Sequence, residues 1–116
     1  MAKHAFLLLS SPQNPGKFAN PLTYATQLAD AGHEVVIYFD GAATNWFDGI
    51  DDRAPPAVEA YEAAKADGLI AGVCDHCATV MDVADSVAAE GFEIDGTEHS
   101  PDTAALVDDG YELHMV

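Results

Sequence analysis

Basic residues are scarce in this sequence. Only four lysines and arginines stand against 20 aspartates and glutamates, which gives a formal net charge of −16. A charge of this size repels phosphate, so nucleic acids and anionic membranes are unfavourable partners. The acids could form one local binding surface, but they spread along the chain without a long block. This spread favours a general solvation role, as in proteins of salt-in halophiles, where the Debye length shrinks to ~3 Å at molar ionic strength.

Long apolar runs are also missing. The apolar run near the amino terminus covers only residues 5–9, which is too short for the core of a signal peptide or for a membrane span of ~20 residues. We therefore expect a soluble, cytoplasmic protein. With 49% hydrophobic residues in 116, the chain is long enough to bury a core, and we expect residues 1–116 to form a single domain.

Cysteines are few and lie close together in the sequence. Cys74 and Cys77 form a single CxxC motif and are the two cysteines of the chain. A secreted disulfide scaffold would need more cysteines at wider spacings, so the sequence does not belong to that class.

Apolar runs alternate with amphipathic stretches. The expected strands are residues 5–9, 35–39, 69–73, 92–94 and 111–116, and the expected helices are residues 20–31, 55–67, 75–90 and 100–109. This order predicts an α/β, three-layer sandwich. Its five-stranded, mainly parallel sheet would have helices on both faces and right-handed crossovers.

Two of the expected helices rest on specific signals. Asn20 and Pro21 have the residue types of an N-cap and first helical position. In residues 75–90, an apolar stripe formed by Val80, Val83, Ala84 and Val87 predicts one continuous helix.

Ligands of open parallel sheets bind beyond the carboxyl ends of the strands. Cys74 directly follows the expected strand 69–73, and Cys77 falls in the first turn of the next helix. Unpaired amides and the helix dipole favour an anion there, so we expect a reactive, accessible thiolate. Two alternatives are that these cysteines are small buried hydrophobes, or that they bind a metal together with histidines drawn from His76, His99 and His114.

Other candidates are weaker. Residues 15–18 read Pro-Gly-Lys-Phe, which fails the phosphate-loop pattern and argues against nucleotide hydrolysis. His4 and His114 fall in strands and are expected to be packed or edge histidines. His76 could be a proton shuttle, could tune the thiol, or could be a solvated loop residue.

The aromatic pair Trp46 and Phe47 lies in the least regular stretch of the chain, residues 42–54. It could cover the core or form a subunit contact, because aromatic residues are enriched at interfaces. The sequence leaves both possibilities open.

Nearly the whole chain resembles the DsrE/DsrF-like family, which includes the TusD-type sulfur-relay subunits. The similar segments are the first strand with its loop, residues 22–35, Phe39-Asp40-Gly41-Ala42, Gly72-Val73-Cys74-Asp75-His76-Cys77, and residues 105–111. The resemblance implies a flavodoxin-like or Rossmann-like sandwich that assembles into trimers or hexamers. It also implies a persulfide carried on Cys74 and passed between partner proteins, with no cofactor; Cys77 matches the subset of members that carry a CxxC.

Three functional hypotheses follow. The first is a sulfur carrier, with possible sulfurtransferase activity, that accepts and passes on persulfide sulfur at Cys74 and uses Cys77 as a possible resolving thiol; its partners would be sulfur donor and acceptor proteins or small thiols. The second is a thiol-disulfide redox protein or redox sensor that uses the same pair, because CxxC alone does not choose between them. The third is an oligomeric interaction module in which the cysteines are incidental.

Overall fold

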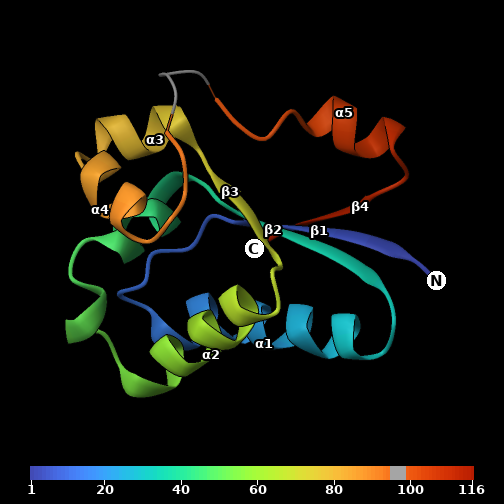
Figure 1. Cartoon of the computed structure of the whole chain (residues 1–116), viewed down its shortest axis with the longest axis horizontal. Helices are drawn as coiled ribbons and strands as arrows, with labels where there is room; N and C mark the ends of the chain where they lie inside the picture. Colours follow the sequence, from blue (N-terminus) through green and yellow to red (C-terminus); the bar gives the residue numbers. More distant parts are fainter. Residues whose placement is uncertain (95–98) are drawn as a thin grey trace.

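A computed structural model describes residues 1–94 and 99–116 as an α/β fold built on a parallel sheet (Figure 1). The strands are β1 (Lys3–Leu8), β2 (Glu34–Phe39), β3 (Ile70–Val73) and β4 (Glu112–Met115). The α-helices are α1 (Pro15–Asp30), α2 (Pro55–Ala66), α3 (Asp75–Val80), α4 (Ala84–Ala89) and α5 (Thr103–Asp108). Two 3₁₀ helices, η1 (Gly41–Phe47) and η2 (Ile50–Asp52), follow β2.

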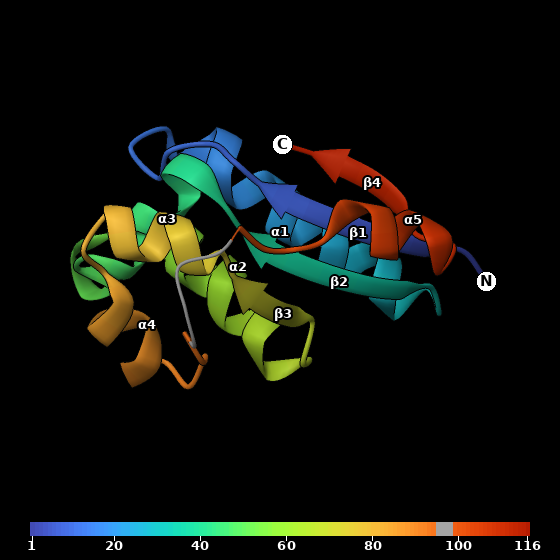
Figure 2. The same ribbon diagram turned by 90° about the horizontal axis from the view of Figure 1, so that it is seen from above.

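The strand order is β3-β2-β1-β4, so the first strand lies inside the sheet and the last lies at its edge. All three strand pairs are parallel. Helices α1 and α2 cover one face, whereas α5 lies on the other face beside β4 (Figures 1 and 2). The predicted parallel α/β architecture is therefore confirmed.

The predicted fifth strand is wrong: within the described residues the sheet has four strands. Phe92 and Ile94, expected in a strand, instead pack against the main core without pairing. The Phe92 amide bonds back to the Val87 carbonyl (3.3 Å) and its ring meets Phe47 edge-on. A three-residue apolar alternation is too short to distinguish a strand from a packed turn.

Helix α1 begins earlier than predicted. Asn14 is its N-cap, and the Asn14 side chain accepts a hydrogen bond from the Lys17 amide. Pro15 then occupies the first turn, where its missing amide costs nothing. Pro21, predicted as the helix start, lies inside α1 and is buried. The predicted start at Asn20-Pro21 is therefore wrong. The same residue pair, asparagine followed by proline, occurs six residues earlier at Asn14-Pro15, and the helix begins there.

The predicted helix over residues 75–90 is two short helices. Asp82 adopts a positive φ of 56° between α3 and α4, and aspartate is one of the few residues that tolerate this conformation. The Val83 amide bonds to the Ala78 carbonyl across the turn. The break separates the predicted stripe: Val80 is 65% exposed, whereas Val83 and Val87 are buried.

The core lies between the sheet and the helices α1 and α2. Trp46 and Phe47 are buried in it, with Trp46 stacked on Phe18 at a centroid separation of 4.7 Å. Of the two roles left open for this pair, the structure places both rings in the core. Tyr61 of α2 donates a hydrogen bond to Glu90 (2.7 Å), which ties the end of α4 to the same core. No described helix has both the length and the apolar character needed to span a bilayer.

Candidate thiol site

The register of two neighbouring strands creates the site. Phe39 at the end of β2 lies opposite Val73 at the end of β3. The Cys74 amide donates to the Phe39 carbonyl at 2.8 Å, which continues the pairing one residue beyond β3. Asp40 and Cys74 are therefore the first residues past two adjacent carboxyl ends, where the sequence placed the candidate chemistry.

Cys74 is the N-cap residue of α3 and is completely buried. Its sulfur lies 4.0 Å from Nδ1 of His99, a residue that follows α4 in the chain. The predicted position at the start of a helix is confirmed. The predicted accessibility is wrong, because the chain returns to this end of the sheet at His99 and Ser100, and His99 lies against the sulfur. We call these two residues the returning segment.

The start of α3 is also less favourable to an anion than predicted. Helix α3 has only six residues, so its dipole is small. The Asp75 amide, at the first helical position, donates to Ser100 Oγ (3.4 Å), and the same hydroxyl lies 3.5 Å from the Val73 carbonyl. Ser100 thus occupies one of the amides at the start of α3 that would otherwise face an anion.

Cys77 is partly buried, and its thiol donates to Oδ1 of Asp40 at 3.3 Å. Burial is the largest cause that raises the pKa of Cys77, and the hydrogen bond to Asp40 and the neighbouring Cys74 also raise it. A hydrogen bond from the Gly41 backbone lowers it, and the net result is a pKa of about 12. Cys77 is therefore a protonated thiol at neutral pH, the opposite of the low-pKa thiolate expected near a helix start.

His99 lies beside both cysteines, although the sequence indicates it only as one of three possible metal ligands. The sulfurs of Cys74 and Cys77 and a ring nitrogen of His99 all lie within 4.8 Å of one another; we call these three residues the thiol cluster. The His76 ring packs against the His99 ring with centroids 4.2 Å apart. His99 is 25 positions from Cys74, and no local spacing signals such a contact.

The thiol cluster has two chemical capacities. Two sulfurs and one imidazole are ligands that zinc accepts, so the set could hold a metal through three donors. An imidazole beside a thiol can also take its proton and leave a nucleophilic thiolate. Of the histidines considered as partners of the cysteines, His99 lies at the cluster, whereas His114 lies elsewhere, 2.8 Å from His4. His4 and His114 are strand residues as predicted.

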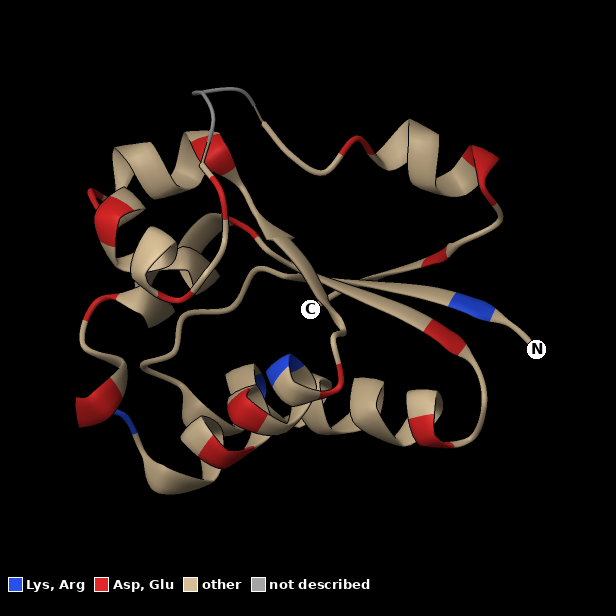
Figure 3. Ribbon diagram, in the orientation of Figure 1, with Lys and Arg blue, Asp and Glu red and all other residues tan. Residues whose placement is uncertain are grey.

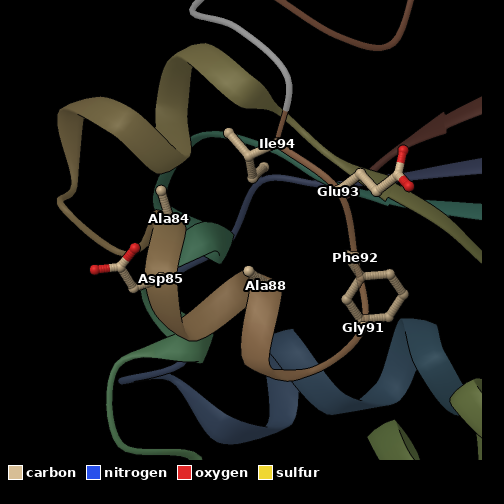
Figure 4. A pocket seen from close by; sticks show the side chains of 7 residues that line it. All are labelled: Ala84, Asp85, Ala88, Gly91, Phe92, Glu93 and Ile94. Carbon is tan, nitrogen blue, oxygen red and sulfur yellow. The ribbon is translucent and has the colours of Figure 1, made fainter.

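A separate pocket of about 440 Å³ lies between α4 and the segment that follows it. Figure 4 shows its lining side chains, which include Asp85, Phe92 and Glu93 but neither cysteine. It presents no thiol, imidazole or cluster of titratable groups among its lining residues. This pocket therefore lacks the groups that thiol chemistry needs.

The acidic residues are distributed over the fold. Aspartates and glutamates lie on helices, strand ends and connecting loops throughout Figure 3, interrupted by a few basic positions. The acidic residues are therefore not gathered on a single helix or strand.

A family model matches almost the entire chain. The model of the DsrE/DsrF-like family aligns with residues 2–113, which include the strand ends, both cysteines and His99. No match to a curated protein or to a solved structure was found. The chain belongs to the DsrE/DsrF-like family.

Proposed function

We propose that this protein is a cytoplasmic sulfur carrier in which Cys74 accepts and passes on persulfide sulfur. The observation that supports this role is the thiol cluster at the ends of β2 and β3, where the Cys74 sulfur has an imidazole nitrogen 4.0 Å away and a second thiol within 4.8 Å. The family match points in the same direction, toward a sulfur-relay-type role.

The proposed uptake step is a thiol exchange. The Cys74 thiolate attacks the outer sulfur of a donor persulfide, R–S–SH. The bond between the donor's two sulfurs breaks, Cys74 becomes Cys74–S–SH, and the donor leaves as a thiol after taking up the proton lost by Cys74. No electrons are gained or lost overall, so the step needs no external oxidant.

Two exits are available to the bound sulfur. An acceptor thiolate can attack the outer sulfur, which produces an acceptor persulfide and regenerates Cys74. Alternatively, the Cys77 thiol can lose its proton and attack the inner sulfur, which forms a Cys74–Cys77 disulfide and releases hydrosulfide. With a pKa of about 12, Cys77 attacks slowly at neutral pH, so the bound sulfur persists long enough for transfer.

His99 is proposed as the base that prepares Cys74. Its Nδ1 lies 4.0 Å from the Cys74 sulfur, and catalytic contacts are often long before substrate binds. Because Cys74 is fully buried, the donor must displace the His99 ring or approach along it. The same residue therefore acts both as a base and as a cover.

The partners implied by this chemistry are sulfur donor and acceptor proteins or small thiols. The whole chain would act as one DsrE-like domain. By similarity to relay proteins, we further propose a homotrimer or hexamer, whose size can be measured by light scattering.

The direct test is intact-mass analysis after exposure to glutathione persulfide in the presence of a chelator. We expect the wild-type chain to gain one sulfur atom, Cys74→Ser to gain none, and Cys77→Ser to gain one. Circular dichroism and thermal unfolding check that each variant folds. An equal gain of sulfur in folded Cys74→Ser would remove Cys74 from the proposal.

A second candidate function is supported by the proximity of the two sulfurs, which places a disulfide within reach. A thiol-disulfide redox protein would cycle between dithiol and disulfide and would need both cysteines. Turnover with a disulfide substrate should then be lost in Cys77→Ser as well as in Cys74→Ser. A carrier instead keeps its sulfur uptake in Cys77→Ser, so this one variant separates the two functions.

A further inference from the structure

Three potential metal ligands meet on the sheet well away from the thiol cluster. His4 Nδ1 lies 2.8 Å from His114 Nε2 and 3.8 Å from a carboxylate oxygen of Glu112. The three ligand atoms all lie within 4.8 Å of one another. We call His4, Glu112 and His114 the histidine cluster; it joins residues 110 positions apart in the chain.

The strand register creates this cluster. β1 and β4 are parallel neighbours, with His4 opposite Glu112 and Phe6 opposite His114. Side chains two residues apart on a strand share a face, so His4, Glu112 and His114 project from the same side of the sheet. Diagonal neighbours across a strand pair are within reach of long and aromatic side chains.

Both imidazoles are held in place by rings. Phe6 packs against His114 with centroids 4.8 Å apart, and His33 meets His4 edge-on at 5.7 Å. The His4 side chain is only 13% exposed, whereas Glu112 is 71% exposed. Two ligands are therefore positioned in advance, and the third is free to swing inward while the outer side stays open to solvent.

We propose that the histidine cluster is a binding site for a divalent transition-metal ion such as Zn²⁺. Two imidazoles and one carboxylate form a ligand set that zinc and related ions use in proteins, with remaining positions filled by water or an incoming ligand. Ligand atoms around such an ion lie about 3 Å apart, given metal–ligand distances of roughly 2 Å, which matches the spacing of the two nitrogens. The strong net negative charge of the chain also attracts cations.

This inference is independent of the sulfur chemistry, but the thiol cluster can also take zinc. The test therefore uses the Cys74→Ser/Cys77→Ser double variant, with Zn²⁺ added and binding followed by calorimetry. We expect about one equivalent of bound zinc. Replacing His114 by Asn in this background should weaken binding roughly tenfold or more, because the loss of a ligand exceeds the typical effect of an outer contact.

Glu59→Gln is the control. Glu59 is an exposed carboxylate of α2 and is not part of the histidine cluster, so its replacement removes one negative charge and should change zinc affinity less than about threefold. If the cysteine variant fails to fold, the wild-type chain can be compared with His114→Asn alone, where the zinc stoichiometry should fall by one. Absence of zinc binding in the cysteine variant, or unchanged affinity in His114→Asn, would reduce the cluster to a hydrogen-bonded pair of histidines and overturn the proposal.

Discussion

The thiol cluster and the histidine cluster are built from similar materials in different surroundings. Each brings three potential ligand side chains within 4.8 Å. The thiol cluster lies beyond the carboxyl ends of β2 and β3, and its Cys74 is fully buried beneath a returning segment. The histidine cluster lies on the strands themselves, at the edge of the sheet, with its carboxylate largely exposed.

The difference shows what each position in a parallel sheet can support. Residues past the strand ends leave the regular hydrogen-bond ladder, so another segment can fold over them and control access, as His99 and Ser100 do at Cys74. Residues within paired strands are fixed by register and cannot be covered without another layer. The first arrangement suits a guarded nucleophile, and the second suits an open binding site for an ion.

The largest expected effect separates the two clusters completely. Cys74→Ser should abolish sulfur uptake, because the remaining thiol, Cys77, has a pKa of about 12 and stays protonated at neutral pH, while zinc binding at the histidine cluster stays unchanged. His114→Asn should do the reverse. Mass analysis and calorimetry on the two variants measure both activities. A substantial loss of sulfur uptake in folded His114→Asn would show that the clusters are coupled.

The next effect concerns His99, which lies against the buried Cys74 sulfur. His99→Gln keeps much of the ring's bulk but removes its basicity, so sulfur uptake at pH 7 should slow by about tenfold to a hundredfold, in the range of general-base catalysis. The rate is measured by quenched intact-mass sampling. His33→Gln is the matched control, since it makes the same substitution beside His4, at the histidine cluster rather than at the thiol cluster. Faster uptake in His99→Gln would mean that the residue is only a cover.

Much of the fold could be predicted from sequence, because buried parallel strands appear as short apolar runs between glycines. Residues 35–39 and 69–73 fall close to β2 and β3 for this reason. The helix break at Asp82 could not be predicted, since the apolar spacing of Val80, Val83 and Val87 continues through it and only the positive φ reveals it. Local periodicity carries no signal for a turn of the backbone, and for this reason Val80 is exposed although it continues the apolar spacing.

The two sites differ in predictability for a related reason. Cys74 and Cys77 are three positions apart, so their proximity is visible in the sequence itself. The contact of Cys74 with His99 and that of His4 with His114 depend on how distant segments return and on which strand lies beside β1. Strand order is a tertiary property, and it makes neighbours of the first and last strands here.

A smaller effect is expected at Cys77. Asp40 accepts the hydrogen bond of the Cys77 thiol, and this bond stabilises the protonated form. Asp40→Asn replaces the carboxylate by a neutral amide, which is a weaker acceptor, so the pKa of Cys77 should fall from about 12; a fall of about one unit would increase the thiolate fraction about tenfold at pH 9. Thiolate absorbance against pH, measured in the Cys74→Ser background, tests this. Asp85→Asn, on α4, should leave the titration unchanged, and a rise in the pKa of Asp40→Asn would contradict the assignment.

The smallest effect concerns the charge that surrounds both clusters. With a net charge of −16, the folded chain repels itself, and molar salt screens this repulsion by shortening the Debye length from about 10 Å to about 3 Å. Raising KCl from about 0.1 M to about 2 M should therefore raise the unfolding midpoint by roughly 4 °C or more, which corresponds to about 1 kcal/mol for a domain of this size. Sucrose of equal osmolality is the control, because it stabilises compact states without screening charge. If the unfolding midpoint rises equally in sucrose and in KCl, screening contributes little. The dispersed acidic residues would then destabilise the folded state only slightly, because their spacing already keeps the repulsion low around both sites.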